Sequence, residues 1–234
     1  EQLRFYTDEV LIDQVRKAVS AGGKMSRKRT VHNLRQVAKD RSVDYWAQYF
    51  DEVIFAYLSG ARGINLDYVL PLDFNGIGDP KNDNEAERQN PLQAPDDTHY
   101  FMGGDAVSKA TMTADDTMTR NLIERINTGC LMLRAKDPTT SNMVPVSGPG
   151  GNNYVLLMSP WQTHDLRVDT GTGNWMDLQK AAAANAGSKS PLFMGGLGLI
   201  GGTVLHEHEK VVRFDDYGAG QNVSAARALF MGSQ

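Results

Sequence analysis

The clearest pattern along the chain lies in residues 27–58, which contain neither proline nor glycine. Hydrophobic side chains recur there at three-, four- and seven-residue steps, the spacing of one helix face. They are Val31, Leu34, Ala38, Tyr45, Tyr49, Val53 and Tyr57, with Trp46, Phe50 and Ile54 widening the face later on. Ser26 is expected to cap the start of this helix. At 1.5 Å per residue it would be about 45 Å long, which predicts a spine for the domain.

The segments on either side of this helix carry no helical pattern. Residues 3–19 alternate between hydrophobic and polar side chains, which predicts extended structure. Residues 60–112 are polar and contain turn signals such as Asn75-Gly76 and Asp79-Pro80. An irregular segment of this length is typical of a surface loop or a partner-binding loop.

The second half of the chain predicts a helix, a central strand and further short elements. A helix is expected to start at Thr113, with Asp116 in a capping position, and to end at Asp137-Pro138. Its buried stripe is expected to comprise Met118, Leu122, Ile126, Cys130 and Leu133. The hydrophobic run 154–158 predicts a central strand, followed by a helix that Ser159 caps and Pro160 begins.

Four more elements complete the expected fold, a helix and three strands. The helix is expected over 175–185, and the strands over 203–208, 211–214 and 226–231. The predicted class is therefore α+β, with one dominant helix and a small central sheet.

The amino-acid composition excludes several classes of protein. Hydrophobic residues make up 41% of the 234 residues, so the chain can bury a core. The formal net charge of −4 is too mild for nucleic acid to be the main partner of the whole molecule. A single cysteine excludes an internal disulfide. We find no signal peptide and no membrane-spanning stretch, and we expect no membrane association.

Two segments carry possible binding chemistry. Residues 196–201 match the dinucleotide pattern G-x-G-x-x-G, but a strand is expected after them where a helix N-terminus is required. His206 and His208 lie two apart on a predicted strand, so both could reach one metal ion. No third ligand is visible nearby, and the alternative is a half-exposed strand at an interface. We assign no metal site and no cofactor.

No catalytic set assembles from the remaining polar residues. Ser159 lacks the G-x-S-x-G elbow of a hydrolase although His164 follows it, and a proline directly after the serine favours capping. Cys130 lies on a hydrophobic helix stripe, where a small buried side chain is the expected role. We therefore predict a protein that is not an enzyme.

Basic residues gather at the start of the long helix. Lys28, His32, Arg35 and Lys39 follow one another at four-, three- and four-residue steps, so they would line one face of a continuous helix. These residues could simply form a solvated surface, and two functional interpretations also stay open. The ridge could contact an acidic neighbouring subunit, or it could contact DNA phosphates.

Several segments in colinear order resemble the major capsid protein family of N4-like tailed bacteriophages. They are residues 10–19, 23–26, the helix through Asp40 and Trp46, YVLLMSPWQ at 154–162, 165–167, 175–181, 195–198, VLHEHE at 204–209 and 226–232. The resemblance covers nearly the whole chain except the loop at 61–111.

This resemblance implies the tailed-phage capsid fold of the Hong Kong 97 type. Residues 1–112 would form a peripheral-type domain, with the spine helix at 27–58 and the long loop at 60–112. Residues 113–205 would form an axial-type domain and 206–234 returning strands. The family's N-terminal arm and extended loop would lie upstream of residue 1.

The implied function is structural. Subunits made in the bacterial host cytoplasm would assemble into pentamers and hexamers of an icosahedral virion head around double-stranded DNA. The expected partners are other copies of the chain, the packaged DNA, and scaffolding, portal and decoration proteins. The alternatives are an encapsulin-like nanocompartment shell, a metal-binding enzyme that uses His206 and His208, and a non-assembling binding module that uses residues 61–111.

Overall fold

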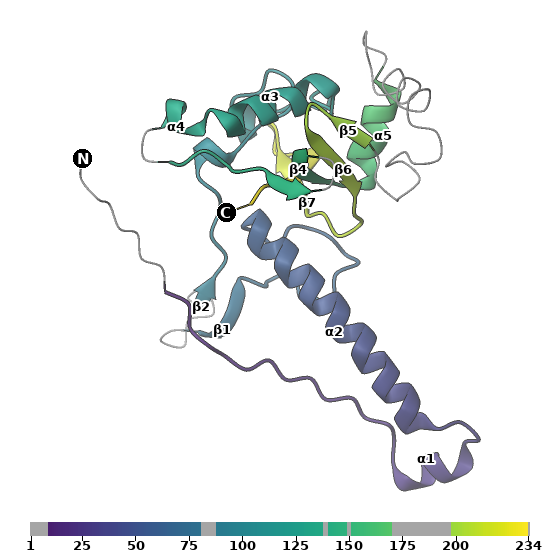
Figure 1. The fold of residues 1–234 in the computed structure, drawn as a ribbon. Helices are drawn as coiled ribbons and strands as arrows, with labels where there is room; N and C mark the ends of the chain where they lie inside the picture. Colours follow the sequence, from purple (N-terminus) through teal and green to yellow (C-terminus); the bar gives the residue numbers. More distant parts are fainter. Residues whose placement is uncertain (1–8, 81–87, 138–139, 149–150, 170–197, 234) are drawn as a thin grey trace. The chain divides into compact units, whose positions relative to one another are not determined.

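A computed structural model describes residues 9–80, 88–137, 140–148, 151–169 and 198–233 (Figure 1). The chain forms two compact units, the first of residues 1–62 and 66–94, the second of 63–65 and 95–234. This division falls at residue 94, whereas the sequence suggested a boundary at 112. Residues 95–112 belong with the second unit because Arg125 donates a hydrogen bond to the Gly104 carbonyl and Tyr100 contacts the Tyr217 hydroxyl.

The first unit is built on two helices where one was expected. They are α1 (Lys24–Arg29) and α2 (Leu34–Ser59), so the prediction of a continuous helix from residue 27 was wrong. Asn33 interrupts it, because its side chain accepts a hydrogen bond from the Gln36 N–H at 3.3 Å and caps α2. Gly60 ends α2 in a left-handed conformation (φ 69°), where a side chain would collide with the Gln93 carbonyl.

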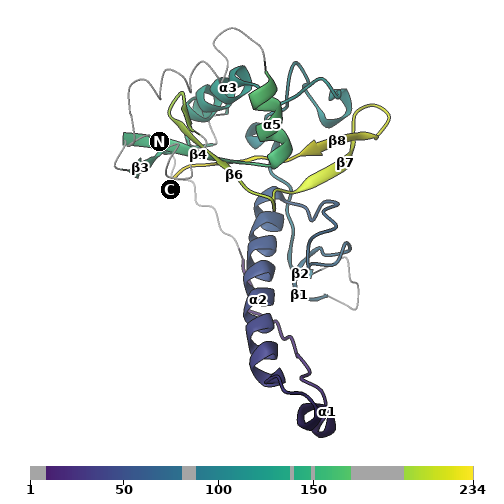
Figure 2. The same cartoon turned by 90° about the vertical axis from the view of Figure 1, so that its right-hand side faces the viewer.

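A two-stranded antiparallel sheet completes the first unit. It pairs β1 (Gly76–Pro80) with β2 (Arg88–Pro91) beside α2 (Figure 2). Residues 9–23 form no strand, although alternation predicted extended structure there. One apolar cluster among the described residues of this unit comprises Val53, Ala56 and Leu70, with Tyr49, Tyr57, Phe74, Ile77 and Leu92 packed around them.

The second unit is built around strand β4, as the hydrophobic run predicted. β4 (Gly151–Met158) runs parallel to β6 and antiparallel to β9, and it also pairs with β3. The other strands of this sheet are β3 (Val146–Gly148), β5 (Gly198–Ile200), β6 (Thr203–Glu207) and β9 (Leu229–Met231). Of the strand expected over 226–231, only β9 belongs to this sheet. Ala226 ends β8 (Val223–Ala226), which pairs with β7 (Arg213–Tyr217) in a separate sheet.

Among its described residues, the second unit has three α-helices: α3 (Arg120–Leu131), α4 (Leu133–Lys136) and α5 (Pro160–Val168). The expected start at Thr113 was wrong, because Thr119 caps α3 and Thr113 forms a separate turn with Asp116. The expected buried stripe is confirmed from Met118 to Leu133. The helix expected over 175–185 lies outside the described residues.

The core of the second unit lies between α3, α5 and the sheet (Figure 1). It comprises Met118, Leu122, Ile123, Ile126, Cys130, Leu156, Met158, Leu166, Ile200 and Leu205. Among the described helices, none is long and apolar enough to cross a membrane.

Candidate interaction surfaces

Helix α2 carries hydrophobic side chains on two opposite sides. One side is buried and includes Val53, Phe55 and Ala56. The other side exposes a row at three- and four-residue steps, which we call the outer stripe: Val43, Ala47, Phe50, Ile54 and Leu58. Apart from Ala47, these side chains are 51–61% exposed. A helix that is hydrophobic on both sides normally has both covered, so the outer stripe is the leading candidate for a docking surface.

Aromatic rings stiffen the middle of α2. Trp46 stacks on Phe50 with ring centroids 5.7 Å apart, and Tyr45 stacks on Tyr49 at 6.1 Å. Burial, and the neighbouring Tyr45, raise the pKa of Tyr49, so its hydroxyl stays neutral. The stacking restricts Phe50 before any partner binds, which lowers the entropy that docking would cost.

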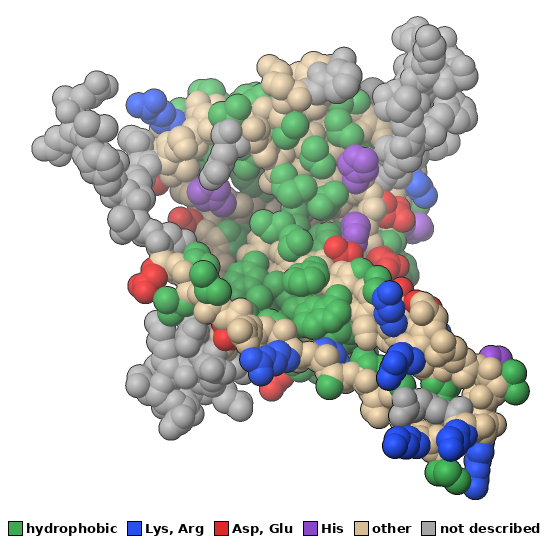
Figure 3. All heavy atoms as spheres, turned by 60° about the horizontal axis from the view of Figure 1, so that its bottom comes forward, with side chains coloured by type: hydrophobic (Ala, Val, Ile, Leu, Met, Phe, Trp, Pro, Cys, Tyr) green, Lys and Arg blue, Asp and Glu red, His purple; other side chains and the backbone are tan. Residues whose placement is uncertain are grey.

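The predicted basic ridge is exposed but is not the face of one helix. Lys28 lies on α1, His32 in the interruption, and Arg35 and Lys39 on α2. Only Arg35 and Lys39 keep the expected helical relation, because the break at Asn33 separates them from Lys28. Figure 3 shows Lys and Arg side chains gathered at this end of the unit, with few carboxylates among them. In the described residues, none of the four forms an ion pair.

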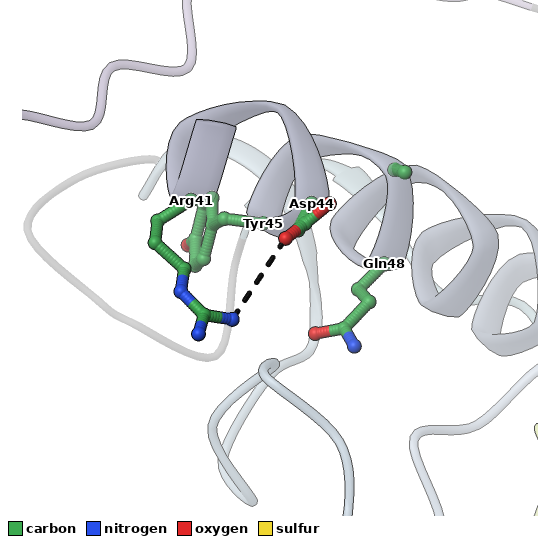
Figure 4. Close-up of a pocket in the computed structure, with 5 residues that line it drawn as sticks. Arg41, Asp44, Tyr45 and Gln48 are labelled. Carbon is green, nitrogen blue, oxygen red and sulfur yellow. Dashed lines mark ion pairs between the residues drawn. The ribbon is translucent and has the colours of Figure 1, made fainter. Parts of the chain in front are cut away.

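A shallow hollow lies beside the next two turns of α2 (Figure 4). Arg41, Asp44, Tyr45, Ala47 and Gln48 line about 440 Å³, and the Arg41 guanidinium lies 3.9 Å from the Asp44 carboxylate. All five side chains come from one helix, so the hollow has no opposite wall. A small molecule would remain largely exposed there, which argues against a ligand pocket.

Buried polar side chains that no sequence pattern indicated support α2. The Glu52 carboxylate is fully buried and accepts the Leu70 N–H at 3.0 Å. Arg62 is 5% exposed, donates to the carbonyls of Leu70 and Pro71, and stacks 4.6 Å over the Tyr68 ring. Burial lowers the pKa of Arg62, while the Tyr68 and Glu52 side chains oppose that shift. No short-range sequence pattern relates Glu52 to Arg62 and Leu70, because Glu52 lies on α2 and the other two lie in the irregular segment after it.

A second unforeseen contact attaches residues 9–19 to the first unit. The Leu11 N–H donates to the Asn90 side chain at 3.0 Å, and the Asn90 amide donates back to the Leu11 carbonyl at 2.8 Å. The Lys17 ammonium lies 4.7 Å from the centre of the Tyr45 ring. Ile12 nevertheless remains 99% exposed, so this segment is attached by polar contacts and not by burial.

The two histidines considered as metal ligands lie at the end of β6, and both are half-buried. The His208 Nδ1 accepts the Lys210 N–H at 3.1 Å, which gives this nitrogen a structural role. Across the part of the chain that the structure describes, no three His, Cys, Asp or Glu side chains could hold one ion. The geometry thus adds no support to the metal-binding alternative.

The remaining candidates have structural roles. Ser159 accepts the Gln162 N–H, and Gln162 accepts the Ser159 N–H, which confirms the predicted helix cap. Burial raises the pKa of Cys130 to about 11, so at neutral pH it is a thiol and a poor nucleophile. Gly201 and Gly202 form the turn between β5 and β6, and the helix that a dinucleotide would need does not follow.

The fold of this chain matches those of two solved phage capsids. The capsid of Ralstonia phage GP4 matches with a TM-score of 0.81 and 55% identity, over 99% of this chain and 60% of that one. The capsid asymmetric unit of cyanophage Pam1 matches with a TM-score of 0.54 and 18% identity, over 85% and 53% of the two chains. The second likeness shows the fold alone. The predicted α+β capsid fold of the Hong Kong 97 type is confirmed.

Sequence comparison gives the same class. The major capsid protein of Pseudomonas phage KPP25 is 25% identical over 246 aligned positions, which cover 100% of this chain and 61% of that protein. The profile of the phage capsid protein family matches residues 1–234, and the chain belongs to that family. It spans about 60% of the length of the KPP25 protein and of the GP4 capsid chain. Membership of the N4-like group stays a prediction.

Proposed function

We propose that this chain forms the shell-building part of a phage major capsid protein and acts by packing against copies of itself. The observation that carries the proposal is the 55% identity to the Ralstonia phage GP4 capsid over 99% of the chain. The exposed outer stripe of α2 supports it, because a structural subunit needs hydrophobic surface that only a neighbour covers. Many modest contacts suffice for a shell, since several neighbours hold each subunit at once.

The finer features of this role are also proposals. Copies would form pentamers and hexamers of an icosahedral head that encloses double-stranded DNA, with scaffolding, portal and decoration proteins as further partners. The subunit would be made in the host cytoplasm and reside in the virion. The first compact unit would be the peripheral domain, because it holds the long helix, and the second would be the axial domain.

The matched relatives favour a phage head over the two main alternatives. They are phage capsid proteins, whereas an encapsulin-like compartment would hold protein cargo instead of DNA. The enzyme alternative required a metal at His206 and His208, and in the described residues no third ligand accompanies this pair. We therefore propose a structural role for the chain.

Electron microscopy of the complete protein, expressed with and without its neighbouring genes, tests the proposal. Regular hollow shells or capsomer rings are the expected result. A chain that stays monomeric under every condition would contradict it, and metal analysis of that monomer would then examine the enzyme alternative.

A further inference from the structure

The outer stripe of α2 continues into a basic end. Arg35 and Lys39 precede Val43 at four-residue steps, so a row of exposed side chains continues from the outer stripe to the start of the helix, turning by about 40° at each step. Both side chains are exposed, and neither forms an ion pair within the described residues. A partner for this surface must therefore be acidic at one end and hydrophobic along the rest.

The second unit carries a group of aspartates, which we call the acidic patch. It comprises the exposed Asp105, Asp115 and Asp216 and the half-buried Asp116. Three contacts bring these positions together: Asp116 packs against Gly103 and Gly104, Lys109 pairs with Asp216, and the Gly218 N–H donates to the Lys109 carbonyl.

Nearby cations do not neutralise the whole acidic patch, and a hydrophobic side chain is exposed in the same segment. Val107, in the same segment, is 86% exposed. The cations nearby are already engaged, since Lys109 pairs with Asp216 and Arg125 donates to the carbonyls of Gly104 and Met102. Asp105 and Asp115 are exposed and form no ion pair in the described part of the chain.

We propose that Arg35, Lys39 and the outer stripe of one copy dock on the acidic patch of a second copy. This inference rests on the proposed function and specifies the surfaces through which copies meet. Because the two surfaces differ, the contact is heterologous, which builds rings or continuing arrays and not closed pairs. Opposite charges would also guide the two copies into one register and disfavour like-charged pairings.

Charge distribution favours a second copy over DNA as the occupant. Residues 1–41 hold ten of the twenty-four Lys and Arg residues but only five of the twenty-eight Asp and Glu residues. The remainder of the chain is therefore strongly acidic and complements this segment. Duplex DNA would satisfy Arg35 and Lys39, but its phosphates would leave the outer stripe uncovered.

Charge reversal with compensation tests this contact in the complete capsid protein. The first variant is Arg35→Glu with Lys39→Glu, the second is Asp105→Lys with Asp115→Lys, and the third combines all four changes. Arg134→Glu with Lys136→Glu is the matched control, because it reverses two exposed cations on α4. Particle yield is measured by sedimentation and electron microscopy, and binding of duplex DNA by the unassembled protein is measured alongside.

The first two variants are expected to lower particle yield about tenfold or more, because each opposes like charges across the contact. The combined variant is expected to recover most of the yield, and the control to assemble normally. Normal assembly of the first two variants, or no recovery in the combined one, would overturn the inference, as would loss of DNA binding with assembly intact. Failure of the wild-type chain to assemble would instead contradict the proposed function.

Discussion

The two compact units of this protein stabilise themselves in different ways. In the described residues of the second unit, one cluster of ten buried hydrophobic residues lies between two helices and a sheet. In those of the first unit, a cluster of three buried hydrophobic residues is accompanied by buried polar anchors such as Glu52 and Arg62. More than half of the large hydrophobic side chains exposed in the described residues belong to this first unit.

This difference indicates whether the hydrophobic side chains of each unit are buried inside it or remain exposed. In the described part of the second unit, hydrophobic side chains of the helices and the sheet are buried against one another. In the first unit, α2 places only one of its hydrophobic sides inward, and buried hydrogen bonds fix the segment that packs there. A shell subunit combines both properties, since it must fold before it assembles and still offer surface to its neighbours.

The largest effect is expected from a cavity in the second unit. Leu205 is fully buried in β6, so Leu205→Ala should lower the free energy of unfolding by about 2–5 kcal/mol. Denaturant unfolding followed by tryptophan fluorescence measures the change. Leu199→Ala is the matched control, because that side chain in β5 is 52% exposed and its removal should cost much less. Equal losses in the two variants would show that this core does not dominate stability.

A smaller effect is expected when a polar anchor of the first unit is removed. Glu52→Ala deprives the buried Leu70 N–H of its acceptor, which should cost about 1–3 kcal/mol. Limited proteolysis should then cut within residues 62–72 faster than in the wild-type chain. Asp51→Ala removes an exposed carboxylate from the same helix and should change neither measurement. Unchanged cleavage in the Glu52 variant would argue that hydrophobic packing alone holds this segment.

Two of the helix caps, Ser159 in the second unit and Asn33 in the first, should differ in their contribution to stability. Ser159→Ala removes a buried cap with reciprocal hydrogen bonds, and we expect a loss of about 1 kcal/mol or slightly more. Asn33→Ala removes an exposed cap whose bond water can replace, so the loss should be about half as large. Thermal unfolding by circular dichroism compares the variants. The reverse order would contradict the view that the second unit carries more of the stability.

Elements set by local chemistry were predictable from the sequence. Ser159-Pro160 combines a cap and a first helical residue, and the structure confirms both roles. The hydrophobic run of β4 has no polar alternation, and the strand is indeed central in its sheet. The start of α2 was missed because Asn33 lies within a stretch free of glycine and proline, where its competing side-chain bond leaves no pattern.

Features that depend on distant contacts were not predictable. The parallel pairing of β4 with β6 and the departure of β8 from the sheet join residues that no short-range pattern relates. Helical spacing correctly predicted that Arg35 and Lys39 share one helix. It wrongly predicted that Lys28 lies on the same helix. The acidic patch was missed because its residues come from two separate segments and form no charge run.

The smallest effect on stability, and the sharpest distinction between the two sides of α2, comes from adjacent residues. Val53 is 8% exposed and Ile54 is 55% exposed. Ile54→Ser should change the unfolding free energy of the unassembled chain by less than about 0.5 kcal/mol, yet lower particle yield, because the outer stripe loses hydrophobic area that a neighbour covers. Val53→Ser should destabilise the unassembled chain by about 1 kcal/mol or more, because the core loses two methyl groups and gains a hydroxyl. Unfolding of the monomer and sedimentation of particles separate the two outcomes. If Ile54→Ser assembles normally, the outer stripe is ordinary surface and the docking surface must lie elsewhere on the subunit.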